Sequence, residues 1–234
     1  ESNNWALIGT ALANQRTGKH IIISSIEHPA VSAPAEFLES QGFSVTRLNV
    51  DAQGKISLKE LEEAMSAETI LVSVMYVNNE IGTLEDISAI GKAIKNKKSD
   101  VLFHVDAIQA FGKFKIYPKR LGIDLMSVSG QKFHAGRGCA FLYVKEGIEL
   151  KPIIYGSQEN SLRGGTYNTA AICGMSKALE LTREHNDTNC LALSAKYTGI
   201  AHAKEIVDVW LETPFSQNER HARRIAKITS YEGE

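Results

Sequence analysis

The chain has 234 residues, enough for one large domain or two small ones. Hydrophobic residues make up 43% of it, as in an ordinary globular core, and its formal net charge at pH 7 is -1. This near-neutral balance excludes nucleic-acid binding through a basic surface, and no apolar run is long enough to cross a membrane. The three cysteines do not suit a disulfide framework or a metal site, so we expect no metal and a reducing, cytoplasmic environment.

Short apolar runs rich in β-branched residues alternate with amphipathic, helix-like segments in the first two thirds of the chain. In chain order they predict a strand at 20–25, a helix at 30–41, a helix at 57–66, a strand at 69–77, a helix at 86–97, and strands at 101–106, 124–129 and 140–145. Ser57 and Glu60 have the spacing of a capping box at the start of the second helix. The runs lack polar alternation, which predicts an α/β fold with a mostly parallel sheet and helices on both faces.

The last third of the chain has a different pattern. Residues 151–168 lack periodicity and are rich in Gly, Ser and Asn, so we expect a loop there. The pattern then predicts a helix at 169–185, a strand at 190–195, a helix at 198–212 and a charged helix at 219–230. The chain opens without a methionine, and we interpret its start at Glu1 as a cut end.

Polar side chains follow four of the predicted strands, where ligands bind in open α/β sheets. They are His28, Asn78, Asn79, Asp106, Gln109, Ser129, Gln131 and Lys132. Pyridoxal phosphate needs a lysine to carry it and a carboxylate to keep its ring nitrogen protonated. The set therefore favours a site for this cofactor at the carboxyl edge of the sheet.

Each of these residues, taken alone, also has a structural interpretation. Lys132 is then a surface lysine, and Asp106 is a turn or helix-cap residue. His28, which precedes Pro29, is then a capping histidine, and the Asn78-Asn79 pair forms a turn. Spacing does not decide between the two interpretations.

Five segments resemble the cysteine desulfurases of the class V aminotransferase superfamily, in the same order along the chain. They are EHPAV (27–31), VNNEIGT (77–83), HVDAIQAFGK (104–113), DLMSVSGQKFHAGRG (124–138) and QENSLRGGT (158–166). The resemblance covers residues 1–180 and implies the large domain of a fold-type I pyridoxal-phosphate enzyme. It also implies a homodimer that removes sulfur from L-cysteine and passes it to sulfur-acceptor proteins, for iron–sulfur clusters or thio-tRNA.

The resemblance implies a role for each residue that matches a family motif. Lys132 forms the Schiff base with pyridoxal phosphate, Asp106 pairs with the ring nitrogen, and His28 stacks on the ring and assists proton transfer. The remaining cofactor contacts are implied for Gln109, Asn79, Ser129, Gln131 and Thr166. In this set Gln109 and Asn79 lie at the ring hydroxyl and Ser129 at the phosphate, and Thr166 reaches the phosphate of the partner subunit.

Three departures from the family pattern make us expect weak cofactor binding and no desulfurase turnover. Gln131 replaces a histidine that helps to hold the phosphate, and a glutamine offers only an uncharged hydrogen bond. A phosphate-binding turn that precedes Glu1 in the family is missing. None of Cys139, Cys173 and Cys190 matches the sulfur-accepting cysteine of the family, and we expect all three to be buried.

From about residue 182 the sequence resembles the C-terminal third of the type B ribose-5-phosphate isomerases instead. The matching segments are 183–215, which opens REHNDTN, and 220–228. The resemblance implies that His185 acts in sugar ring opening, that Asn186 lies in the substrate site and that Arg220 binds the sugar phosphate. We therefore expect residues 1–180 and 181–234 to be two parts of a chimera. An isomerase fragment and a non-catalytic fusion or assembly protein are the alternatives to a desulfurase core.

Overall fold

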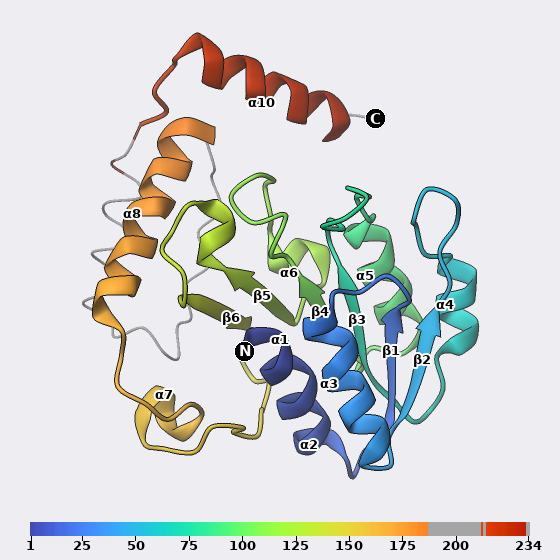
Figure 1. Ribbon diagram of the computed structural model, residues 1–234. Helices are drawn as coiled ribbons and strands as arrows, with labels where there is room; N and C mark the ends of the chain where they lie inside the picture. The colour runs from blue at the N-terminus through green and yellow to red at the C-terminus, as the bar shows by residue number, and fades with distance from the viewer. Residues whose placement is uncertain (187–211, 213, 233–234) are drawn as a thin grey trace. The chain divides into compact units, whose positions relative to one another are not determined.

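Figure 1 shows the computed structural model of the chain, which describes residues 1–186, 212 and 214–232. The chain divides into two units. The first comprises 1–109, 117–128 and 140–166, and the second comprises 110–116, 129–139 and 167–234. The predicted strand 190–195, and the predicted helix 198–212 except its last residue, lie outside the described residues.

The first unit contains a six-stranded sheet with the order β2-β1-β3-β4-β5-β6. The strands are β1 (His20–Ser24), β2 (Ser44–Leu48), β3 (Thr69–Met75), β4 (Leu102–Asp106), β5 (Leu125–Ser129) and β6 (Ala140–Val144). The pairs from β2 through β5 are all parallel. Backbone hydrogen bonds from Lys145 to Asp124 and from Gly130 to Cys139 show that β6 runs antiparallel to β5. The prediction of a mostly parallel sheet is confirmed.

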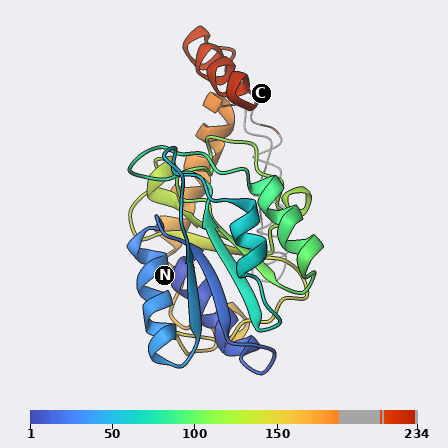
Figure 2. The same ribbon diagram turned by 90° about the vertical axis from the view of Figure 1, so that its right-hand side faces the viewer.

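Helices cover both faces of this sheet, as Figure 2 shows most clearly. One layer holds α1 (Ser2–Asn4), the π-helical turn η1 (Trp5–Gly9), α2 (Thr10–Asn14) and α3 (Pro29–Ser40). The other layer holds α4 (Leu58–Ala64), α5 (Ile87–Lys97) and the short α6 (Pro118–Leu121). Apolar residues of α3 and β1, such as Leu38 and Ile21, are fully buried between the first layer and the sheet. The predicted α/β architecture is confirmed.

Local sequence signals start the helices of this unit. Pro29 occupies the first turn of α3, where its missing N–H costs no hydrogen bond. Asp86 caps α5 by accepting a hydrogen bond from the Ala89 amide at 2.9 Å. The predicted capping box of α4 is only half formed. Ser57 Oγ accepts from the Glu60 amide at 3.3 Å, but the Glu60 carboxylate accepts from the Asn49 amide instead, at 3.1 Å.

Two buried histidines link neighbouring strands through hydroxyl groups. The ring nitrogens of His20 lie 2.8 Å from Thr69 Oγ1 and 2.9 Å from Thr46 Oγ1, which joins β3, β1 and β2. His104 lies in the same way between Ser73 Oγ at 2.8 Å and Ser127 Oγ at 2.9 Å, which joins β3, β4 and β5. Together the two side chains bridge all five parallel strands.

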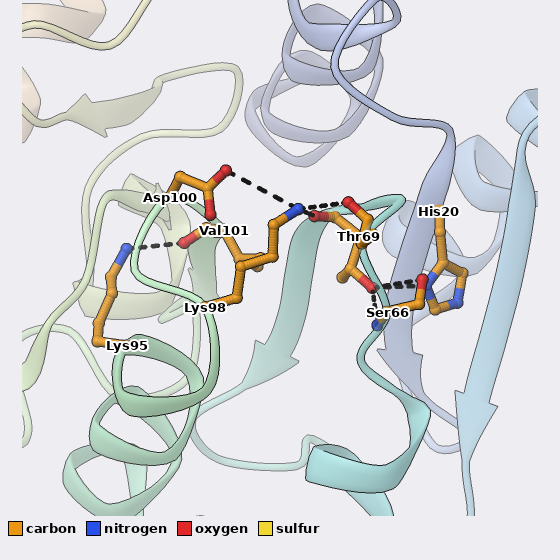
Figure 3. A network of polar contacts seen from close by, with 8 residues as sticks. His20, Ser66, Thr69, Lys95, Lys98, Asp100 and Val101 are labelled. Carbon is orange, nitrogen blue, oxygen red and sulfur yellow. Dashed lines mark hydrogen bonds and ion pairs between the residues drawn. The ribbon is translucent and has the colours of Figure 1, made fainter.

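Two lysines bind the backbone at the beginning of neighbouring strands, as Figure 3 shows. Lys95 lies on α5, and Lys98 directly follows that helix. Lys98 Nζ donates to the backbone carbonyl of Thr69 at 2.9 Å, and Lys95 Nζ donates to that of Val101 at 2.7 Å. Lys95 also contacts the buried carboxylate of Asp124, which Lys145 Nζ reaches at 3.0 Å. These contacts fix the end of α5 against β3, β4 and β5.

The remaining described elements are mostly helical. In the first unit, α7 (Gln158–Ser161) is one irregular turn with positive φ at Glu159 and Asn160, so the predicted loop at 151–168 is largely a loop. The second unit holds the 3-10 helix η2 (Gly130–Phe133), α8 (Thr169–Asn186) and α10 (Glu219–Glu232). The last two confirm the helices that were predicted at 169–185 and 219–230.

Candidate functional site

The strand order places a reversal of winding at the carboxyl ends of the central strands of the first unit. From β1 the chain crosses to β2 on one side and later to β3 on the other, so the direction of winding reverses between β1 and β3. The helices that follow these two strands diverge at such a point and leave room for a ligand. Residues that come just after β1, β3 and β4 therefore line the candidate site.

Asp106 is the last residue of β4 and is 4% exposed. Its Oδ1 accepts a hydrogen bond from the Ile108 amide at 2.9 Å, and its Oδ2 accepts one from Asn3 Nδ2 at 2.7 Å. Burial raises the pKa of this carboxyl, while the two hydrogen bonds and nearby His28 oppose that rise. Among the described residues it has no ion-pair partner, which is unusual for a buried carboxylate.

Glu27 is a second buried carboxyl at this edge, and the sequence did not predict it as a site residue. Its Oε1 accepts from Ser24 Oγ at 2.6 Å and from the Met75 amide at 2.8 Å, which ties the ends of β1 and β3 together. Its Oε2 is buried and has no hydrogen-bond partner among the described residues. Burial, with a smaller contribution from nearby Asp106, raises the pKa of Glu27 to about 8 against the opposing effect of its two hydrogen bonds, so Glu27 is mostly neutral at pH 7.

His28 caps α3, which is the structural role that the sequence left open for it. Its Nδ1 accepts from the Ala30 amide at 3.0 Å, so a neutral ring carries its proton on Nε2. The side chain is exposed, and its charge lowers the pKa of Asp106. This electrostatic influence places His28 near Asp106, and the capping bond does not involve Nε2.

Two roles were open for the Asn78-Asn79 pair, formation of a turn and contact with a ligand, and the two residues differ in which one they suit. Asn78 is buried, donates to the Ile26 carbonyl at 3.0 Å and accepts from the Glu80 amide at 2.8 Å, so it builds the turn after β3. Asn79 is exposed and donates to Glu80 Oε1 at 2.7 Å. Asn79 therefore stays the candidate for ligand contact, and Gln109 is half-buried three residues after Asp106.

Lys132 belongs to the second unit, on the 3-10 helix η2 that directly follows β5. Lys132 and Gln131 are exposed and Ser129 is half-buried. The buried Phe133 ring packs on Phe111 at a centroid distance of 5.4 Å and anchors this turn. Partial burial, together with the nearby Lys132 ammonium, lowers the pKa of Lys113 in the same unit. Lys132 on this turn and Lys113 on a separate segment of the same unit therefore lie near each other.

The other predicted site residues lie further along the chain. Thr166 is exposed in the first unit, just after Gly164 and Gly165. His185 and Asn186 are the last described residues of α8, and Arg220 is exposed in the first turn of α10.

The cysteines differ in exposure. Cys139 is buried, as expected, and burial raises the pKa of its thiol. Cys173 is exposed, so the expectation that it is buried was wrong: it lies on the solvent side of α8, whereas Ala178 of the same helix is buried. Cys190 lies outside the described residues. The part of the chain that the structure describes holds no cluster of metal-ligating side chains and no helix fit to span a membrane.

Comparison with known proteins now decides the family. The protein family described as "Aminotransferase class-V" matches residues 1–205 of this chain. The chain belongs to the aminotransferase class-V family. This class V match extends past residue 182, where the resemblance to the isomerases begins, and the isomerase-like tail stays a prediction.

The class V relatives include desulfurases. Cysteine desulfurase IscS of Clostridium botulinum is 47% identical over 186 residues, which are 79% of this chain and 46% of the relative. Cysteine desulfurase IscS of Dictyoglomus turgidum is 43% identical over 219 residues, or 92% of this chain and 55% of the relative. The chain thus spans about half the length of the curated relatives that it matches.

Solved structures of other proteins are similar to this chain as well. A NifS-like protein superposes with a TM-score of 0.76 and 37% identity, over 79% of this chain and 51% of the other. The structure of SspA in complex with cysteine superposes with a TM-score of 0.73 and 34% identity, over 97% of this chain and 66% of the other.

Proposed function

We propose that this chain is the pyridoxal-phosphate-binding core of a cysteine desulfurase. The observation that carries the proposal is Asp106, a buried carboxylate at the carboxyl end of β4 without an ion-pair partner among the described residues. Each of its oxygens accepts one hydrogen bond, and a carboxylate oxygen has room for a second. A protonated ring nitrogen is the cation that such a site lacks.

The residues of this chain fit pyridoxal phosphate. The cofactor, when bound, supplies an electron sink that stabilises negative charge on the substrate carbon. Asp106 would hold its ring nitrogen protonated, and Lys132 would bind it covalently through Nζ. His28 would move a proton through Nε2, which its capping bond leaves free. Gln109 and Asn79 would orient the ring hydroxyl.

The phosphate would be held by residues from separate segments. Ser129 and Gln131 flank the start of η2, and Thr166 would reach the site of a partner subunit in a homodimer. Gln131 donates only an uncharged hydrogen bond to a phosphate, so we expect weaker binding than a histidine at this position would give.

The proposed reaction takes sulfur from L-cysteine. A thiolate attacks the substrate sulfur, the C–S bond breaks, and the products are a persulfide and alanine. A sulfur-acceptor protein then takes up the persulfide sulfur. Cys139 is a poor nucleophile because burial raises the pKa of its thiol. Cys173 is exposed but lies within a regular helix rather than on a mobile loop.

Absorbance tests the proposal. Purified chain titrated with pyridoxal phosphate should gain the visible band of a lysine-bound cofactor, and Lys132→Ala should abolish it. Lys119→Ala, which removes an exposed lysine of α6, serves as the matched control and should keep the band. A band of equal strength in wild type and Lys132→Ala would exclude Lys132 as the carrier.

Sulfide release from L-cysteine in the presence of dithiothreitol tests the substrate. Because neither described cysteine combines exposure with a mobile loop, we expect release no higher than in Lys132→Ala. Release that requires Lys132 and disappears in Cys173→Ser would show instead that Cys173 accepts the sulfur.

A further inference from the structure

Asn3 joins the N-terminal helical segment to the candidate site. It lies on α1 and is 1% exposed, and its Nδ2 donates to Asp106 Oδ2 at 2.7 Å across a separation of 103 residues. Both residues belong to the first unit. The short donor–acceptor distance is that of a strong, charge-assisted hydrogen bond.

With the hydrogen bond from Asn3, both oxygens of the Asp106 carboxylate have a donor. The Ile108 amide donates to Oδ1 at 2.9 Å and Asn3 donates to Oδ2, so each oxygen has one donor from a different element. Two donors on opposite oxygens fix the plane of the carboxylate, whereas one donor leaves it free to turn about its terminal torsion. We propose that Asn3 is a positioning residue that holds the Asp106 carboxylate in the orientation needed to pair with the cofactor ring nitrogen. This inference rests on the proposed function.

The chemistry of the amide suits this task. An asparagine donates a hydrogen bond without bringing a charge, so the carboxylate stays available to a cationic ligand. A lysine or arginine in its place would form an ion pair with Asp106 and compete with the ring nitrogen.

The other polar atom of Asn3 argues against a purely structural role. Asn3 Oδ1 is buried and has no hydrogen-bond partner among the described residues. A buried acceptor without a partner lowers the stability of the fold. An apolar side chain would avoid this cost, so the bond to Asp106 is the feature that distinguishes asparagine here.

The influence of Asn3 on Asp106 can be measured through the pKa of the Asp106 carboxyl. The titratable group whose charge acts on Asp106 is His28, which lowers its pKa, while the carboxyl of Glu27 lies close enough for Asp106 to raise the pKa of Glu27. Burial is the largest influence and raises the pKa of Asp106, and the Asn3 hydrogen bond opposes it. Removal of that bond should therefore raise the pKa, because it stabilises the ionised form.

Titration of Asp106 by carboxyl carbon-13 NMR in the cofactor-free protein is the test. Asn3→Leu keeps the approximate size of the side chain and removes the donor, and we expect the pKa of Asp106 to rise by about one unit. Asn3→Ala should give the same shift if Asn3→Leu does not fold. Asn14→Ala, on α2, is the control, because the Asn14 side chain donates to Thr10 O of its own helix at 2.9 Å; it should leave the pKa of Asp106 unchanged.

The same variants separate this inference from the proposed function. An Asp106 pKa equal to that of wild type in a folded Asn3 variant would overturn the positioning role. Failure of the wild-type chain to bind pyridoxal phosphate would overturn the proposed function and leave the NMR comparison intact. With cofactor bound, the pH at which its absorbance changes should shift in Asn3→Leu and not in Asn14→Ala.

Discussion

At the scale of single residues, the candidate site is a set of polar groups held by backbone and by each other. Asp106 was predicted because a carboxylate at a strand end is visible in the sequence. Asn3 and Glu27 were not, because their roles depend on partners such as Asp106 and Met75 that lie far away along the chain. Glu27 directly precedes His28 after a buried strand, and that position was the one available signal.

Gln131 is the residue at which a single change should improve cofactor binding. Gln131→His places a group that can carry a positive charge in the position where the family holds the phosphate. A hydrogen bond from a charged donor exceeds one from a neutral donor by about 1 kcal/mol, so we expect roughly fivefold tighter binding of pyridoxal phosphate. Equal dissociation constants in an absorbance titration at pH 6 would contradict this role for Gln131.

At the scale of elements, the sequence was most informative where strands are buried on both faces. All five residues of β1 and all seven of β3 are buried, which gives the continuous apolar runs that predicted them. Strand β2 was missed because it lies at the sheet edge and keeps Ser44 and Arg47 exposed, so its run is interrupted by polar residues. The helical segment from α1 to α2 was missed as well, and half of the capping box of α4 was replaced by a contact to Asn49.

The packing of α5 against α6 depends on a glycine. A Cβ at Gly91 would lie 2.2 Å from the carbonyl oxygen of Leu121, so no side chain fits there without movement of the backbone. Gly91→Ala should therefore lower the free energy of unfolding by about 1–3 kcal/mol, although alanine is the better helix former. Urea denaturation followed by circular dichroism measures this change.

Gly174 on α8 provides the matched control for Gly91. A Cβ at this helical position meets nothing within 4 Å. Gly174→Ala should therefore raise stability by about 0.5–1 kcal/mol, since only the helix preference acts. Effects of the same sign in both variants would show that the contact with Leu121 does not govern Gly91.

At the scale of the whole molecule, buried titratable groups on the sheet set how stability depends on pH. Burial lowers the pKa of His104 to about 3 from 6.5, since the ring sits fully enclosed between Ser73 and Ser127. Burial lowers the pKa of His20 as well. Burial raises the pKa of Glu27 to about 8 from 4.5. The histidines and the glutamate thus act on stability in opposite directions.

The direction of each effect follows from which state binds more protons. Between pH 6.5 and about 3 the unfolded chain protonates His104 and the folded chain does not, so stability falls as the pH is lowered. Between pH 4.5 and about 8 the folded chain keeps the proton of Glu27 and the unfolded chain has lost it, so stability falls as the pH is raised. In the overlap from 4.5 to 6.5 the two effects cancel.

We therefore expect the cofactor-free chain to be most stable in a plateau near pH 4.5–6.5, with losses of about 1.4 kcal/mol per pH unit per proton on either side. Glu27→Gln keeps the hydrogen-bonding shape of the neutral acid and cannot titrate, so it should flatten the decline between pH 6.5 and 8 and leave the slope below pH 4.5 unchanged. Because the cancellation is lost, stability of this variant should rise with pH between 4.5 and 6.5. His104→Gln should flatten the limb below pH 4.5, apart from the share that His20 retains, and extend the alkaline decline down to pH 4.5. Urea denaturation at half-unit pH steps measures both limbs. An alkaline decline in Glu27→Gln as steep as in wild type would mean that Glu27 is ionised in the folded protein at pH 7, and that Asp106 has a second negative charge beside it.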